Sequence, residues 1–225
     1  MSKPPVNADA RRATRPYKSP KREQRAQETR RRIRDTASRL FLRDGYAATT
    51  MTAIARAAKV GERTVYLAFP TKPALLGEII TVAVRGGDDD APLAARDAWQ
   101  QVLAAPDEQI LTRLADAIEA ILARTAPVLE VAEAAAASNP ELAAQRERGQ
   151  RNMRSDYRAV GDALARSGVL ADTVTSEYAA DTIYALAGHD VYLRLTRECG
   201  WTGARYAAWL GDTLSAALTR SARRR

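Results

Sequence analysis

Apolar residues recur along this chain at three- and four-residue intervals from about residue 23 to residue 221, and no segment alternates like a half-buried strand. We therefore predict an all-α protein. Its first helix is expected to begin near Glu23 and to end at Gly45, because glycine is a common helix stop. The inner face of this helix carries Ile33, Ala37, Leu40 and Phe41, with Asp44 in the same register.

Two short helices joined by a tight turn are predicted next, over residues 50–57 and 61–69. Thr49 and Thr50 can each cap the first of them through the side-chain hydroxyl. One apolar stripe then follows at helical spacing: Met51, Ile54, Ala55 and Ala58. The turn is Lys59-Val60-Gly61, in which Gly61 is expected to supply the conformational freedom. The second helix turns Val65, Ala68 and Phe69 inward and leaves Glu62, Arg63, Thr64, Tyr66 and Leu67 outward.

Helical patterns continue to the C-terminus. Gly86-Gly87-Asp88-Asp89-Asp90 interrupts them as a flexible acidic link or as the start of the next helix. The later helical segments are predicted at 93–103, 110–122, 128–137, 140–167, 173–198 and 203–221. The expected organisation is a disordered basic arm (1–22), a helix-turn-helix domain (23–72), a connecting helix (73–87) and a larger helical domain (88–225).

The formal net charge of +8 is concentrated in the first part of the chain. Residues 1–85 hold 19 Lys and Arg against 7 Asp and Glu, and residues 86–225 hold 16 against 20. The net charges are therefore +12 and −4. A basic end that coincides with a helix-turn-helix pattern indicates a partner with phosphates. The arm either lies in a minor groove or is a solubilising tail, and its composition fits both.

The residues of the turn region resemble the TetR family of bacterial transcriptional regulators. The match is to Gly45-Tyr46, Thr49-Thr50, Ile54-Ala55, Val60, Thr64-Val65-Tyr66 and Phe69 with Thr71-Lys72, at the family's spacing. It covers about residues 25–75 and is far more specific than a short motif. The resemblance implies that residues 50–57 are the positioning helix and residues 61–69 the recognition helix of a protein that binds double-stranded operator DNA.

The resemblance also implies roles for individual side chains. Arg63 and Thr64 are expected to touch base edges, since a guanidinium can grip guanine and a threonine methyl can touch thymine. The expected phosphate contacts are Thr49, Thr50, Tyr66 and Lys72. Glu62 either accepts from cytosine N4 or faces away from the phosphates. Met51 stands where other members often read the groove.

Two further properties are implied by the resemblance. The final two helices are expected to pair with a second copy as a homodimer through Tyr184, Val191, Leu195, Tyr206, Leu210, Thr213 and Ala217, although the same faces can instead close the monomer core. The middle helices are expected to enclose an unidentified small-molecule effector. The candidate lining residues, each of which can equally be plain core, are Trp99, Leu103, Leu114, Ile118, Met153, Tyr157 and Tyr178.

The sequence contains no pattern that is typical of an enzyme or of a membrane protein. His189 is the only histidine and Cys199 the only cysteine, so neither a metal site nor a nucleophile with its base can be assembled from them. We expect no cofactor, no metal and no catalytic residue. A run of about 18 apolar residues and a signal leader are both absent, which predicts no membrane contact and a cytoplasmic protein.

Two functions remain from these observations. The first is a sequence-specific DNA-binding regulator, a repressor released by a small-molecule ligand. The alternative is a helical ligand-binding or interaction protein whose DNA contacts are incidental. The charge distribution and the spacing from Thr64 to Lys72 favour the first.

Overall fold

The computed structural model describes residues 20–89, 96–106 and 108–219. Its elements in chain order are α1 (Pro20–Asp44), α2 (Met51–Ala57), α3 (Glu62–Ala68), α4 (Lys72–Arg85), α5 (Asp97–Leu103), α6 (Ile110–Ala136), α7 (Pro140–Ser167), α8 (Ser176–Leu186), α9 (His189–Leu193), the π-helical turn η2 (Arg194–Glu198) and α10 (Gly203–Leu218). Within the described ranges the only extended pairing is an isolated bridge between Leu170 and Thr219. The all-α fold class is confirmed.

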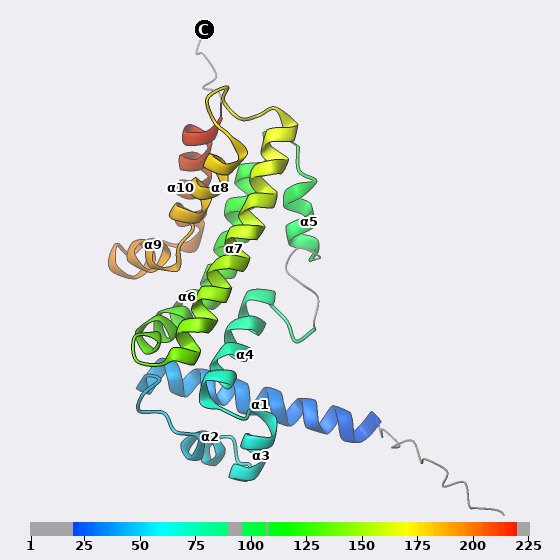
Figure 1. Ribbon diagram of the computed structural model, residues 1–225, viewed down its shortest axis with the longest axis vertical. Coiled ribbons are helices and arrows are strands. Elements are labelled where there is room, and N and C mark those ends of the chain that lie inside the picture. The colour runs from blue at the N-terminus through cyan, green and yellow to red at the C-terminus, as the bar shows by residue number, and fades with distance from the viewer. Residues whose placement is uncertain (1–19, 90–95, 107, 220–225) are drawn as a thin grey trace, which may run out of the picture.

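The molecule is elongated, with α1, α2 and α3 at one end and the long helices α6 and α7 leading away from them (Figure 1). We call α1–α4 the head and α5–α10 the body. In the body, α8 packs on α7, while α10, α9 and α5 pack on α6.

Each end of the molecule has its own apolar core. The head core gathers the inner faces of α1–α4 and also takes in Val128, Ala135, Ala136 and Leu142 from the corner between α6 and α7. The body core contains the first half of α6 together with α5, α7, α8 and α10. Helix α6 therefore belongs to both cores, and the head buries its apolar surface partly against the body.

The prediction of separate helices over 110–122 and 128–137 is wrong, because α6 runs through both segments with Pro127 inside it. A proline removes one backbone hydrogen bond and usually ends or kinks a helix. Here the buried residues Ala126 and Val128 on either side anchor the two halves in the body and head cores respectively. The 140–167 prediction agrees with α7.

The single helix predicted over 173–198 is also wrong. Helix α8 ends at Leu186, and Gly188 has the extended backbone of an N-cap for α9 (φ −70°, ψ 147°). A Cβ at Gly188 would lie 2.4 Å from Asp190 Oδ1, so glycine at this break makes room for the next turn. The apolar period alone does not reveal such a break, because it resumes in α9.

The two ends of the head also differ from expectation. Helix α1 begins at Pro20, three residues before Glu23, and proline is favoured at the first helical position. Residues 20–22 of the predicted arm are therefore helical, and residues 1–19 lie outside the described part. The chain after α4 does not start a new helix at Asp88. Gly86 (φ 74°) caps α4 instead, and the next described helix begins at Asp97.

In the turn between α2 and α3, the unusual backbone conformation occurs at Lys59 and not at Gly61, where it was expected. Lys59 has φ +54°, in the left-handed region, whereas Gly61 has φ −69° and serves as the N-cap of α3. A left-handed non-glycine residue is strained by about 1–2 kcal/mol. The amide of Val60 donates to Ala55 O at 3.0 Å and holds the turn closed.

We expect Lys59→Gly to raise the free energy of unfolding by up to about 1 kcal/mol, because glycine relieves the strain but loses more entropy on folding. Gly61→Ala is the control, since its Cβ would meet only Thr64 Oγ1, at 3.8 Å. Urea unfolding measures both. A destabilised Lys59→Gly beside an unaffected Gly61→Ala would contradict this assignment.

Candidate nucleic-acid interface

The helix-turn-helix unit is built as its apolar pattern predicts. Thr50 caps α2 by accepting the amide of Ala53 at 3.0 Å. The α2 stripe of Met51, Ile54, Ala55 and Ala58 is buried in the head core. Val65 and Phe69 hold the inner side of α3 and are 0% and 1% exposed, with Ala68 half-buried beside them. The core therefore fixes which side of α3 remains outside.

The outer face of α3 is free of protein cover. Glu62, Arg63 and Thr64 are exposed, as are Tyr66 (50%) and Leu67 (75%). Helix α3 lies at the end of the molecule farthest from α5 and α8 (Figure 1). A short helix with an exposed cationic and hydroxyl-bearing face at the tip of a domain can enter a major groove about 12 Å wide.

Thr49 does not reach this surface, which corrects one expectation; Met51 does not reach it either, as its place on the apolar stripe of α2 predicts. Thr49 is 2% exposed, and its hydroxyl donates to Gly45 O at 2.8 Å, so it closes the loop after α1 and is not available to a phosphate. Met51 is 7% exposed in the head core and cannot read a groove. Of these two adjacent threonines, only Thr50 therefore lies at the surface.

Lys72 fastens the loop between α1 and α2 to the start of α4. Its Nζ donates to Tyr46 O at 2.8 Å and to Thr49 O at 2.9 Å, and lies 4.2 Å from the centroid of the Tyr46 ring. Burial lowers the pKa of Lys72 and raises that of Tyr46 to about 12. The Tyr46 phenol is therefore neutral where its ring faces the Lys72 ammonium. An ammonium has three donors, which leaves one for a phosphate.

Arg30 is a site residue that the sequence analysis missed. Its Nε and Nη2 donate to the two carboxylate oxygens of Glu78, each at 2.9 Å, and Nη1 donates to the carbonyl oxygen of Ala68. Its guanidinium carbon also lies 4.1 Å from the centroid of the Phe69 ring. The Arg30 side chain thus joins α1, the end of α3 and α4. Its hydrogen bonds hold the pKa of Glu78 below the usual value.

Arg34 makes the equivalent connection one turn later. It is 8% exposed and donates to Asp88 in the segment after α4, and to Asp35 at 3.4 Å. Asp89 in the same segment pairs with Arg96, just before α5, at 2.6 Å. The acidic segment is therefore held between head and body. The helical period contained a signal for both arginines, because Arg30, Arg34, Ala37 and Phe41 share one face of α1.

The body brings most of the predicted effector residues together as core. Trp99, Leu114, Ile118 and Tyr157 are buried in one cluster, and Leu103 and Met153 pack against it. Tyr178 is 56% exposed, so its predicted place in an internal pocket is wrong.

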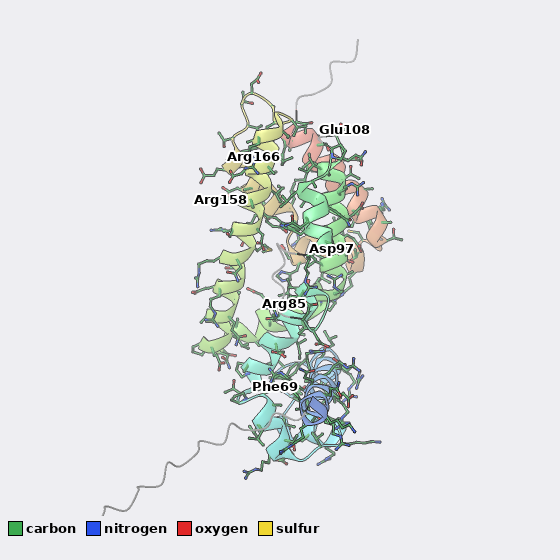
Figure 2. All side chains as sticks on the ribbon, turned by 90° about the vertical axis from the view of Figure 1, so that its right-hand side faces the viewer. Phe69, Arg85, Asp97, Glu108, Arg158 and Arg166 are labelled. Atoms are coloured by element: carbon green, nitrogen blue, oxygen red, sulfur yellow. The ribbon has the colours of Figure 1, made fainter. Side chains whose placement is uncertain are left out.

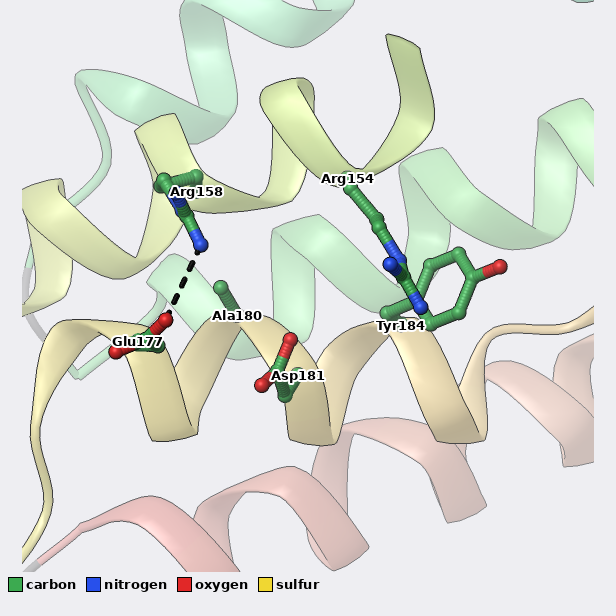
Figure 3. Close-up of a pocket in the computed structure, with 6 residues that line it drawn as sticks. All are labelled: Arg154, Arg158, Glu177, Ala180, Asp181 and Tyr184. Carbon is green, nitrogen blue, oxygen red and sulfur yellow. Dashed lines mark hydrogen bonds and ion pairs between the residues drawn. The ribbon is translucent and has the colours of Figure 1, made fainter. Parts of the chain in front are cut away.

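A surface hollow of about 370 Å³ lies between α7 and α8 and contains none of the predicted lining residues (Figure 3). Four of its lining residues are charged, Arg154, Arg158, Glu177 and Asp181, and the other two are Ala180 and Tyr184. Arg158 pairs with Glu177 at 3.3 Å, and the guanidinium carbon of Arg154 lies 4.8 Å from the centroid of the Tyr184 ring.

The residues predicted for a subunit interface divide by burial. Tyr206 and Leu210 are both 0% exposed inside the body core, so their assignment to an interface is wrong. They face inward because α10 packs closely on α6, with a Cβ at Gly211 only 3.6 Å from Ala115 Cβ. Of the other five residues, Ala217 is exposed, and four are half-buried: Tyr184, Val191, Leu195 and Thr213.

Other kinds of site find little support in the described part of the chain. It contains no group of three or more potential metal ligands from His, Cys, Asp and Glu. No single described helix is long and apolar enough to cross a membrane; α3 and α4 pass that test only as a pair bent by 60°.

Comparison with known proteins places the head in a family. Residues 33–79 match the model for bacterial regulatory proteins of the tetR family. These residues include α2, α3 and the connecting turns described above. No curated protein sequence matches the chain.

Solved structures share the whole fold at low sequence identity. NalD of Pseudomonas aeruginosa, described as the secondary repressor of the MexAB-OprM multidrug efflux pump, has a TM-score of 0.67 and 23% identity, covering 88% of this chain and 99% of its own. A transcriptional regulator from Saccharomonospora viridis in complex with choline has a TM-score of 0.66 and 21% identity, covering 86% and 99%.

A TetR-family regulator from Syntrophomonas wolfei has a TM-score of 0.68 and 16% identity, covering 85% of this chain and 95% of its own. The likeness to these three proteins extends the shared fold from the head to the body. Residues 33–79 thus match the tetR family of bacterial regulatory proteins, and the rest of the chain shares the fold of these three solved structures.

Proposed function

We propose that this protein is a cytoplasmic, homodimeric repressor that binds operator DNA through α3 and is released by a small-molecule effector. The observation that carries the proposal is the exposed polar face of α3 within a head that matches the family. Structural neighbours support repression and release by a small molecule: NalD is described as a repressor, and SmeT was solved with triclosan.

Within this proposal the α3 face divides into reading and positioning groups. Arg63 and Thr64 stand in the first turn of α3, where recognition helices present side chains to base edges. Thr50, Tyr66 and the remaining N–H of Lys72 are placed to bind phosphates on either side. Glu62, exposed beside Arg63, is the residue that can select cytosine.

A dimer is proposed because one seven-residue helix contacts too few base pairs to specify a genomic site, whereas a two-fold pair reads two half-sites. Its interface is placed on α8 and α10, which contact each other along one edge of the body (Figure 1). This edge exposes Tyr178 and small residues that permit close helix contact: Ala185, Ala204, Ala208, Ala216 and Ala217.

The effector is proposed to act in the body. The head buries its core partly against α6 and α7, and Asp88 binds Arg34 of α1. A ligand that shifts these helices therefore changes the position of the head.

Binding to the DNA upstream of the protein's own gene tests the proposal. We expect preference over a shuffled duplex at about 150 mM salt, and binding that weakens steeply with added salt. Equal binding to both duplexes would reject specific recognition and favour incidental DNA contacts.

Arg63→Ala is expected to weaken operator binding about tenfold and to reduce the preference over shuffled DNA, since a base-edge contact is worth about 1–3 kcal/mol. Tyr66→Phe should weaken binding to both duplexes by a smaller, similar factor, because it removes a phosphate hydrogen bond. Arg166→Ala, at the far end of α7 (Figure 2), is the control for loss of one positive charge. Fluorescence anisotropy measures all three, and an Arg63→Ala variant that behaves like the control would remove Arg63 from the interface.

A further inference from the structure

The first half of α1 is exposed and strongly basic. Residues 21–28 are all exposed, and the first buried apolar residue of the helix is Ile33. Five exposed basic residues lie in this half: Lys21, Arg22, Arg25, Arg31 and Arg32. We call these five residues the basic face of α1.

The basic residues of α1 divide sharply by their partners. Arg30, Arg34, Arg39 and Arg43 each donate to a described side chain: Glu78, Asp88, Thr36 and Asp44 respectively. No residue of the basic face forms a side-chain hydrogen bond or ion pair with another described residue. Intramolecular pairing therefore accounts for these four arginines but not for the five residues of the basic face.

Helix stability does not account for the basic face either. The N-terminal end of a helix favours acidic side chains, because the unpaired amides there carry partial positive charge. Glu23 is the only acid in the first turn of α1, whereas Lys21 and Arg22 stand beside it. These cations are unfavourable for the isolated helix, so their removal should not unfold α1.

The position of the basic face relates it to α3. Helix α1 crosses the head, and its N-terminal end projects past α3 at the same end of the molecule (Figure 1). At 1.5 Å per residue, the 12 residues from Lys21 to Ile33 extend about 18 Å beyond the first buried apolar position. A major groove is about 12 Å wide, so a segment of this length is long enough to reach the backbone beyond a groove that α3 enters.

We propose that the basic face of α1 binds the phosphate backbone flanking the site read by α3, without reading bases. The proposal rests on the proposed function, in which α3 enters the major groove. Lys21, Arg25 and Arg32 lie on one side of the helix by their spacing, and Arg22 and Arg31 flank it. The basic face thus lengthens the protein's footprint and adds affinity of electrostatic origin.

The test is the triple variant Lys21→Gln, Arg22→Gln, Arg25→Gln in the full chain. The matched control removes three charges from α7: Arg151→Gln, Arg158→Gln, Arg166→Gln; of these residues, Arg158 and Arg166 lie far from the head (Figure 2). We expect the α1 triple to bind operator DNA about tenfold more weakly at about 150 mM salt. The slope of log K against log salt should fall by about 2.7, or 0.9 per lost phosphate contact. Preference for operator over shuffled DNA should stay unchanged.

The length of the duplex provides a second readout. On a duplex trimmed to the bases under α3, the wild type and the α1 triple should bind equally, because the flanking phosphates are gone. A salt slope equal to that of the α7 control on long DNA would overturn the proposal. So would loss of binding to phosphatidylserine vesicles with DNA binding intact, since the basic face would then serve a lipid surface.

Failure of the proposed function is separable from failure of this inference. The former appears as a wild type that does not distinguish operator from shuffled DNA. The salt slope of the α1 triple is measured on either duplex, so its result stands in both cases. Circular dichroism of both triples should match the wild type.

Discussion

Gly161→Ala is expected to lower the free energy of unfolding by about 2–3 kcal/mol, at the upper end of the range for overpacked sites. Gly161 is buried inside α7, where α8 begins against it. A Cβ at this position would lie 2.3 Å from the carbonyl oxygen of Ser176 and 3.4 Å from Ala180 Cβ. The first neighbour is backbone, so α7 and α8 must separate to admit a methyl group.

Gly149→Ala is the matched control for this substitution. Gly149 lies in the same helix, is exposed, and has no atom within 4 Å of an added Cβ. Alanine there should stabilise the protein by about 0.5–1 kcal/mol through helix propensity. Urea unfolding of the two variants at one fixed protomer concentration separates packing from propensity, because a dimer makes stability depend on concentration.

The difference between the two variants is the quantity that tests the fold. We expect it to be about 3 kcal/mol, and a difference below about 0.5 kcal/mol would show that α7 and α8 do not meet at Gly161. The same contact bears on the proposed dimer, since α8 lies on its interface. Gly161→Ala should therefore also shift the monomer–dimer equilibrium toward monomer, which analytical ultracentrifugation measures.

Most of the head was predictable because its apolar period is unbroken. The residues expected inside α1, α2 and α3 are buried or half-buried, apart from the polar Asp44, and those expected outside α3 are exposed. Helix spacing fixes a face once one position on it is known to be buried. The strained turn residue was missed because glycine signals flexibility wherever it occurs, while Lys59 adopts φ +54° under the constraint of the closed turn.

Helix breaks in the body were less predictable than helices. The break predicted between residues 122 and 128 does not occur, because both cores hold α6 across Pro127, whereas Gly188 makes a break that the apolar period conceals. Tyr206 and Leu210 show the same limit for interfaces. An apolar stripe predicts burial but not the partner that provides it, and here the partner is α6 of the same chain.

The contacts of polar and charged side chains were the hardest to predict from the sequence. Thr49 and Thr50 are adjacent and chemically identical, yet one hydroxyl is buried against Gly45 O and the other caps α2. Arg30 stands among other arginines, and only the fold brings Glu78 within 2.9 Å of it. Such pairs join segments 48 residues apart in the chain, a separation that local periodicity does not address.

Arg30→Met is expected to weaken operator binding by about 10- to 100-fold, although Arg30 contacts the inner end of α3 and not its outer face. The substitution removes the bidentate pair with Glu78, the bond to Ala68 O and the cation over the Phe69 ring, while keeping an apolar stem. The end of α3 then loses its fixed position against α1 and α4. Arg30→Lys should recover little, because an ammonium cannot reproduce the bidentate geometry.

Three measurements distinguish this positioning role from a direct phosphate contact and from general destabilisation. The salt slope of binding should stay at the wild-type value in Arg30→Met, unlike in the α1 triple, because no phosphate contact is lost. Glu78→Gln should reproduce part of the defect, whereas Arg39→Met should not, because Arg39 lies on the same helix as Arg30 but makes only one bond, to Thr36 at 3.2 Å.

The third measurement is acid unfolding. Because pairing lowers the pKa of Glu78 in the folded state, its contribution is complete above the ordinary pKa of 4.5 and is lost as pH falls through the lower folded value. Arg30→Met should flatten the acid dependence in that range, and an unchanged acid profile with a reduced salt slope would place Arg30 at the DNA instead.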